Sequence, residues 1–136
     1  MSFLEKLFPK QQPVKPSQIE FILAKHFRGF KRFPMVVHGH KEAEENNERL
    51  KDMDFPDHTI AFRPGSSPTY KDPFYLVFID NLNVGAIFDK EHIKSIKDGK
   101  ITAVYAKSEE ENVASGKNIV KRHRIRLFVK YKEAET

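Results

Sequence analysis

Apolar residues are grouped along the chain in short runs, a pattern typical of β-strands. Residues 19–24 suit either a helix or a strand, and their β-branched and aromatic content favours a strand. Residues 74–79 are continuously apolar, which predicts a strand buried on both faces. Further strands are expected at residues 59–63, 84–88, 101–106 and 119–132, and residues 34–37 form another short apolar piece. A turn is expected at residues 80–83 and a polar loop at residues 108–116.

A short amphipathic helix is expected at the start of the chain. Ser2 followed by Glu5 has the spacing of a capping box and predicts a helix over residues 1–8. Residues 9–17 contain two prolines without periodicity and are interpreted as a linker. The Phe and Leu side of the helix is expected either to pack on the domain or to bind a protein partner or a membrane surface, although two turns are too short to bind a membrane well alone.

Two further segments have helical character. Asp89 is expected to cap a short helix with Ile93 and Ile96 on one side, which Gly99 ends. Residues 41–51 are rich in acidic helix formers but have almost no apolar stripe. They are expected to form an exposed helix or a mobile excursion, so the segment 42–57 is partly helical and acidic.

The length of 136 residues favours one domain, expected over residues 18–133. Mostly strands with one helix between them predict a mainly β (α+β) fold, most simply a small closed β-barrel. The absence of cysteine excludes disulfide scaffolds, thiol catalysis and zinc–thiolate sites. No apolar run is long enough for a bilayer, and the first residues do not form a secretory signal, so a cytoplasmic location without a membrane partner is expected.

Positive charge is concentrated in two segments. The net charge is only +5, but residues 117–132 carry seven basic side chains and no acid, and residues 25–32 carry four basic side chains. Residues 42–57 carry seven acids. Basic segments of this kind favour polyanionic partners.

The last predicted strand separates apolar from basic residues. Alternate side chains of a strand point to opposite faces. One face is expected to join the core: His123, Ile125, Leu127, Val129 and Tyr131. The other is expected to project outward as a row of cations around one aromatic ring: Arg122, Arg124, Arg126, Phe128, Lys130 and Lys132. Such a row matches the spacing of phosphates and predicts salt-sensitive binding of nucleic acid, although cations also protect the edges of sheets.

Residues 25–33 form a second basic and aromatic segment. Cations alternate there with phenylalanines, and His26 adds another flat ring. Cations for phosphates together with rings for bases are what single-strand binding requires. The alternative is that the phenylalanines are core residues and the cations lie on a solvated turn.

The middle of the chain resembles the HIRAN domain, a small β-barrel related to OB folds and found attached to DNA-repair helicases or alone in bacteria. The matching segments are the strand and turn at 22–29, the proline, tyrosine and aspartate loop at 62–72, the strand at 74–78, the pair Val84 and Gly85, and the helix at 89–96. The resemblance implies an OB-like barrel over about residues 19–130, in which residues 33–58 are an insertion.

Some HIRAN domains bind the 3′ end of single-stranded DNA through this turn and this loop. Carried over by position, the resemblance implicates Lys25, His26, Phe27, Tyr70 and Asp72. Asp72 would accept a hydrogen bond from the terminal hydroxyl. The chain departs from the family pattern because lysine replaces arginine in the turn, and the tyrosine and aspartate are not adjacent.

No nucleotide-binding or hydrolase motif occurs in the chain, so a non-enzymatic module without cofactor or metal is expected. The leading hypothesis is an accessory module that binds single-stranded nucleic acid, with DNA favoured. The alternative is a protein-interaction or structural module. The residues expected to bind nucleic acid are Lys25, His26, Phe27, Arg28, Tyr70, Asp72, Arg122, Arg124, Arg126, Phe128 and Lys130.

Overall fold

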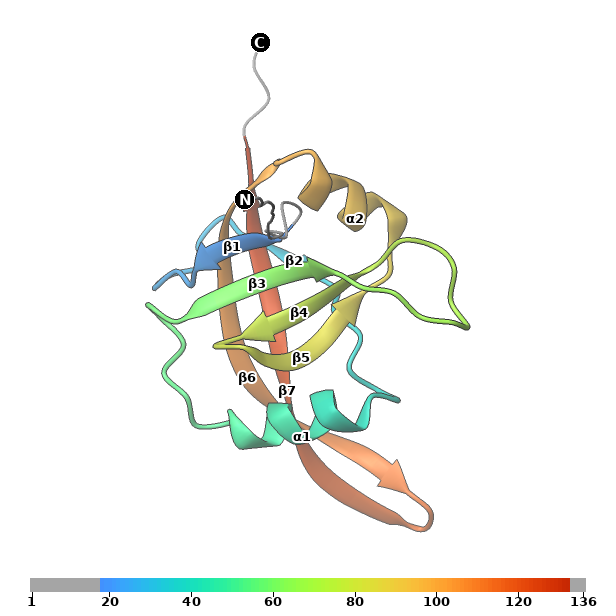
Figure 1. The fold of residues 1–136 in the computed structure, drawn as a ribbon. Coiled ribbons are helices and arrows are strands. Elements are labelled where there is room, and N and C mark those ends of the chain that lie inside the picture. The colour runs from blue at the N-terminus through green and yellow to red at the C-terminus, as the bar shows by residue number, and fades with distance from the viewer. Residues whose placement is uncertain (1–17, 133–136) are drawn as a thin grey trace, which may run out of the picture.

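Two antiparallel sheets form the body of the protein in the computed structural model, which describes residues 18–132 (Figure 1). Sheet A has the order β1 (Ile19–Ile22), β3 (Thr59–Pro64), β4 (Tyr75–Ile79) and β5 (Leu82–Ile87). Sheet B has the order β2 (Lys31–Phe33), β7 (Asn118–Tyr131) and β6 (Ile101–Ser115). Helix α1 (Lys41–Arg49) follows β2, and α2 (Lys90–Lys97) follows β5. The mainly β class predicted from the sequence is confirmed, whereas the expected helix at 1–8 and the linker at 9–17 lie outside the described residues.

The two sheets meet at two narrow seams. At one, the backbone N–H of Ala24, just after β1, donates to the carbonyl of Val104 on β6 over 2.8 Å. At the other, Val36, just after β2, exchanges two backbone hydrogen bonds with Ala86 on β5, at 2.8 and 2.9 Å. The strand ladders of residues 18–132 therefore form two sheets and not the one closed barrel expected from the sequence.

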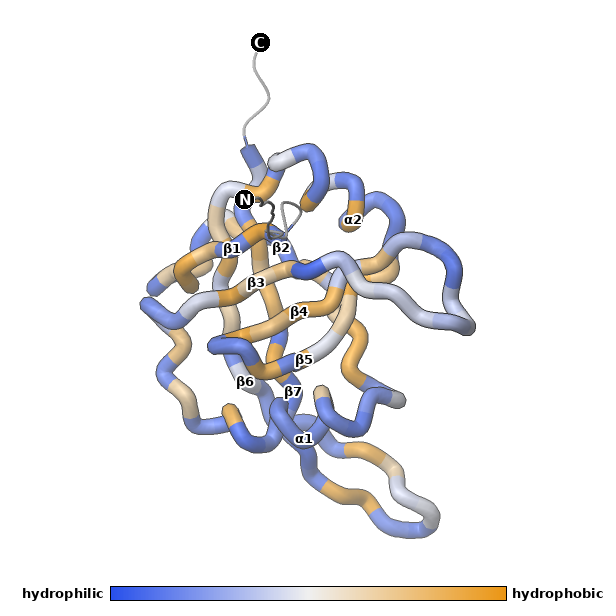
Figure 2. Tube along the Cα trace, in the orientation of Figure 1, coloured by the Kyte–Doolittle hydropathy of each residue, from blue (hydrophilic) through white to orange (hydrophobic). Residues whose placement is uncertain are grey.

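Side chains from both sheets and α2 form one apolar core. Ile125, Leu127 and Val129 alternate along β7 and are fully buried, as the sequence predicts. Phe33 from sheet B packs edge-on against Phe62 from sheet A, with ring centroids 6.1 Å apart. Figure 2 shows apolar positions along the strands and hydrophilic ones along the helices and turns. No helix within residues 18–132 combines the length and apolar character that crossing a bilayer requires.

The hairpin of β4 and β5 follows local sequence signals. Asp80 and Asn81 adopt positive φ angles of 49° and 69° in its two-residue turn, a conformation that these residue types tolerate best after glycine. The prediction that the first strand of this hairpin is buried on both faces is wrong, because Leu76 and Phe78 are only half-buried. The Arg63 guanidinium lies 4.1 Å from the Phe78 ring centroid. It covers this face of the strand, where a strand buried on both faces would have a second layer of apolar side chains.

Gly85 on β5 allows the chain that leaves β2 to pass close above it. A Cβ atom at this position would lie 2.6 Å from Cγ of Met35 and 2.8 Å from the carbonyl oxygen of Val36. Only glycine leaves room for this approach, which places Val36 against Ala86 and closes the second seam.

The predicted short helix after Asp89 is confirmed as α2, whereas α1 is more buried than expected. The Asp89 carboxylate accepts the backbone N–H of His92 at 3.2 Å and caps α2. Within the acidic segment, α1 buries Asn46 and Asn47 against the sheets. The Asn46 amide donates to the carbonyl of Asn83 at 2.7 Å, so this helix is fixed by amide hydrogen bonds and not by an apolar stripe.

The predicted polar loop at 108–116 is instead the second half of β6. This strand pairs with β7 without interruption from Ala103 to Ser115. Residues 111–122, here called the ribbon, project past α1 as a two-stranded hairpin (Figure 1). The pairing places Glu109 opposite Arg124 and Glu111 opposite Arg122, so charges that are separated in the sequence meet across the ladder.

Candidate nucleic-acid interface

The arginines expected to project freely from β7 are engaged by the protein's own carboxylates. Nε of Arg122 lies 3.1 Å from a Glu111 oxygen. Nε of Arg126 lies 3.3 Å from Glu109, and its Nη2 lies 3.4 Å from Glu111. The prediction of an unpaired arginine row is therefore wrong, because the acids come from the strand that was predicted to be a loop.

Arg124 is almost completely buried. Its side chain is 4% exposed, with Nη2 3.6 Å from Glu44 on α1 and Nε 3.7 Å from Glu111. Burial first and the neighbouring Arg122 second lower the pKa of Arg124 below its ordinary value, although nearby acids oppose this. A guanidinium in this position supports the packing of α1 on β7 and cannot contact a polyanion on the surface.

The structure places three aromatic rings from three segments together on the outer face of sheet B. Phe27, in the turn between β1 and β2, lies 4.8 Å from the ring centroid of Tyr105 on β6 and 5.6 Å from that of Phe128 on β7. The Tyr105 and Phe128 centroids are 6.2 Å apart. Phe27 is 45% exposed, so this aromatic cluster offers an accessible flat ring beside two half-buried ones.

Cations surround the aromatic cluster. Nζ of Lys107 lies 5.5 Å from the Phe27 centroid and 5.4 Å from the Phe128 centroid, within the range of cation–π attraction. A hollow of about 310 Å³ adjoins the rings and is lined by Lys25, His26, Phe27, Arg28 and Tyr105. Four exposed cations near these rings form no ion pair within residues 18–132: Lys25, Arg28, Arg32 and Lys130.

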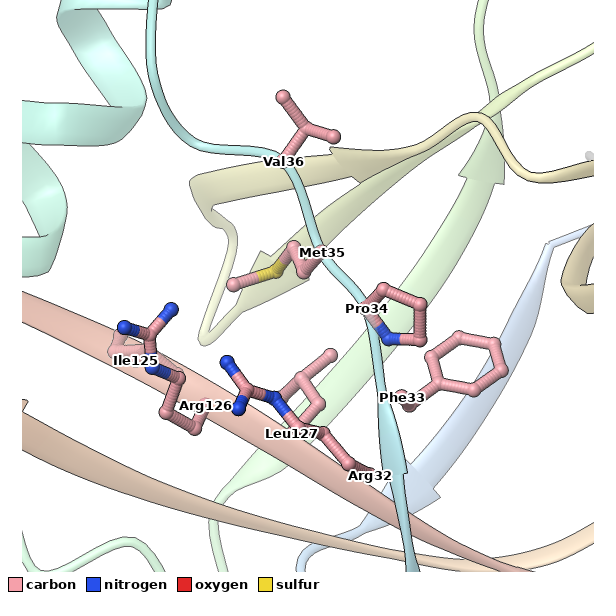
Figure 3. Close-up of a pocket in the computed structure, with 8 residues that line it drawn as sticks. All are labelled: Arg32, Phe33, Pro34, Met35, Val36, Ile125, Arg126 and Leu127. Carbon is pink, nitrogen blue, oxygen red and sulfur yellow. The ribbon is translucent and has the colours of Figure 1, made fainter.

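A second hollow extends this surface at the point where the chain leaves β2. Figure 3 shows the guanidinium groups of Arg32 and Arg126 pointing to the same side, next to Met35. The hollow has a volume of about 240 Å³, and its other lining residues are mostly apolar. Arg32 pairs in register with Phe128, so it lies directly beside the aromatic cluster.

Tyr70 and Asp72 lie elsewhere. The Tyr70 ring packs edge-on against Phe74 and Phe88, with centroids 5.6 and 5.1 Å away. Asp72 lines a hollow beside α2, together with Lys90 and other residues. Figure 1 shows the turn between β1 and β2 on one side of the molecule and the loop between β3 and β4 on the other. The structure therefore does not bring together the two halves of the site that the HIRAN resemblance implies.

Sequence reasoning missed Tyr105 and Lys107, although a signal for both was present. Val104 and Ala106 are buried, so the alternation along residues 101–106 places Tyr105 and Lys107 on the outer face. The contact of Phe27 with these residues joins positions far apart in the sequence, and no local pattern indicates it.

The described residues contain no group of three or more His, Asp or Glu side chains that could hold a metal ion. Comparisons of the chain with protein-family models, with curated proteins and with solved structures find no match.

Proposed function

We propose that the protein is a non-enzymatic module that binds single-stranded nucleic acid on the outer face of sheet B. The observation that carries this proposal is the aromatic cluster of Phe27, Tyr105 and Phe128 among cations without internal partners. The proposed interface differs from the predicted one, because Tyr105 and Arg32 replace the paired arginines of β7. Lys107 contributes through its contacts with the rings, since its Nζ is already paired with Glu109 at 3.0 Å.

Stacking and phosphate contacts would act together on this surface. An exposed ring stacks on any base, and each stacked base contributes about 1–3 kcal/mol to binding. Phe27 is the most accessible ring of the cluster, and it packs against the half-buried ring of Phe128. Lys25, Arg28 and Arg32 lie at the periphery of the rings, where they would neutralise phosphates of a strand whose bases stack on the cluster.

Three parts of the proposal depend on the sequence and on the HIRAN resemblance. They are DNA as the ligand, a cytoplasmic location, and a partly open OB-like barrel formed by the two joined sheets. Recognition of a 3′ end by Asp72 has no geometric support, because this carboxylate lies near α2 and away from the aromatic cluster. We therefore propose binding along a strand.

The test is fluorescence anisotropy of a labelled thymidine oligonucleotide at low salt with three proteins. Phe27→Ala is expected to weaken binding by about tenfold or more relative to the parent, the equivalent of one lost stacking contact. Tyr70→Ala is the matched control, since Tyr70 is also an exposed aromatic residue but lies on the other side of the molecule. Its affinity is expected to equal that of the parent.

A parent protein that binds no oligonucleotide would contradict the proposal and favour the alternative of a protein-interaction module. If Tyr70→Ala weakens binding and Phe27→Ala does not, the interface lies at the loop between β3 and β4 and not on sheet B.

A further inference from the structure

The ribbon leaves apolar side chains in solvent. Ile119 is 75% exposed and Val120 is 44% exposed. The ladder pairs Val113 with Val120 and Ala114 with Ile119, so each face of the ribbon has one apolar pair near its tip. Figures 1 and 2 show this hairpin extending beyond the body with apolar positions along it. An isolated two-stranded hairpin is only marginally stable in water, which favours a partner that covers it.

The outer edge of β6 is open along the same segment. The carbonyl of Val104 accepts from Ala24 and thus points away from β7. Because the ladder has no irregularity after Ala103, every second residue beyond Val104 directs its N–H and C=O to this same edge. After Ala106 these residues are Ser108, Glu110, Asn112 and Ala114, and no strand within residues 18–132 pairs with them.

The opposite edge of the hairpin, on β7, is blocked. Beyond the end of β2, the N–H of His123 donates to Glu48 and the N–H of Ile125 donates to Asn47, both on α1. A strand added to β7 would meet this helix after a few residues. The open edge of β6 is therefore the accessible side for strand addition.

We propose that a second copy of this chain pairs with the open edge, β6 antiparallel to β6, so that two ribbons form one four-stranded sheet. In a two-fold arrangement the same edge of each copy pairs with that of the other, so the free N–H and C=O groups of both edges gain partners at once. The inference does not depend on the proposed binding of nucleic acid.

The charge pattern selects the register of this pairing. With the two-fold axis at Val113, Glu111 lies opposite the uncharged Ser115 of the second copy, whereas an axis at Glu111 would oppose like charges. Residues 112–116 are uncharged, so no buried charge results at the centre. Glu111 is already compensated by Arg122, which lowers the electrostatic repulsion between the two edges.

The test uses the absence of cysteine from the chain. At the two-fold axis Val113 would face its copy in a non-hydrogen-bonded pair, with Cα atoms about 4.5 Å apart. This separation is within the range that a disulfide spans. The Val113→Cys protein is expected to form a covalent dimer rapidly under mild oxidation. Val120→Cys is the matched control: it lies opposite Val113 on β7, so the two introduced thiols would be about 14 Å apart and are expected to cross-link slowly.

Sedimentation velocity of the parent and of Ala114→Pro supplies a second measurement. The N–H of Ala114 points to the open edge, so proline removes a hydrogen bond between copies without removing one from the ladder with β7. We expect the parent to dimerise as its concentration rises and Ala114→Pro to remain monomeric with an unchanged circular dichroism spectrum. A parent that is monomeric up to its solubility limit, or equal cross-linking of the two cysteine variants, would overturn the proposal.

Discussion

Asn47 on α1 accepts the backbone N–H of Ile125 on β7 through its side-chain oxygen, at 2.7 Å. The Nδ2 group of the same amide donates to the carbonyl of Val84 on β5 at 2.9 Å and to that of Ala43 within the helix at 2.7 Å. Asn47 is fully buried. One side chain thus connects the helix to both sheets, which explains how a helix without an apolar stripe packs into the fold.

Replacing Asn47 with alanine is expected to destabilise the protein by about 3 kcal/mol, because three buried backbone groups would lose a partner. Urea unfolding measures the change. Asn112→Ala is the control, since Asn112 is exposed and expected to have little effect. Equal stabilities of Asn47→Ala and the parent would show that the connection between the sheets does not depend on this amide.

Stability should also depend on pH through Glu48. Burial alone would raise the pKa of Glu48, but hydrogen bonds from the backbone N–H (2.6 Å) and the imidazole (2.9 Å) of His123 together hold it below its ordinary value of 4.5. A carboxyl with a lowered pKa stabilises the folded state above its ordinary pKa, and this contribution is lost as the pH falls through the folded-state value.

Glu48→Gln is therefore expected to unfold at lower urea than the parent at neutral pH, with a difference that shrinks below about pH 4.5. Unfolding series between neutral and acidic pH measure this, and Glu45→Gln, at an exposed position on the same helix, serves as the control. A difference that stays constant with pH would show that the carboxylate charge is not involved.

Gly85→Ala is expected to cost about 1–3 kcal/mol, the range for overpacking a filled site. The added methyl group would meet Met35 and the carbonyl oxygen of Val36. Adding Met35→Ala should recover only part of the loss, because the backbone oxygen stays in place. Thermal unfolding of the three proteins measures this, and complete recovery in the double variant would show that the backbone of Val36 moves aside freely.

The proposed interface predicts which cations govern salt dependence. For a single strand, each phosphate contact contributes about 0.7 to the slope of log affinity against log salt concentration. The combined change Lys25→Gln and Arg28→Gln should lower this slope by up to about 1.4. Arg122→Gln should leave it unchanged, since that guanidinium is paired with Glu111. Anisotropy titrations at several salt concentrations give the slopes, and the reverse result would locate the interface on β7.

Elements with local signals were predictable from the sequence. Asp89 is followed by a helix because its carboxylate caps the first turn, and the turn at Asp80 and Asn81 uses residues that tolerate positive φ. The buried face of β7 was predictable for a similar reason, since burial on one side produces the alternation of Ile125, Leu127 and Val129. In these cases the sequence pattern and the structural cause lie within a few residues of one another.

The second half of β6 could not be recognised in this way. None of residues 107–115 is buried, so Glu109, Glu110 and Glu111 follow one another without the alternation that a half-buried strand shows. What defines this strand is its partner, whose arginines lie more than ten residues later. The candidate site changed for the same reason, because the partners of Arg122 and Arg126 depend on a pairing that was not predicted.

The two seams between the sheets are places where the structure can open locally. Ala24 holds one seam through a single backbone bond, and Val36 holds the other through a pair. Local opening of either seam would break these few bonds while each ladder stayed intact, so these amide protons would exchange with solvent before those inside the sheets. Because Phe27 and Arg32 lie on the stretch of chain between the two seams, such motion would shift one wall of the aromatic cluster relative to Tyr105.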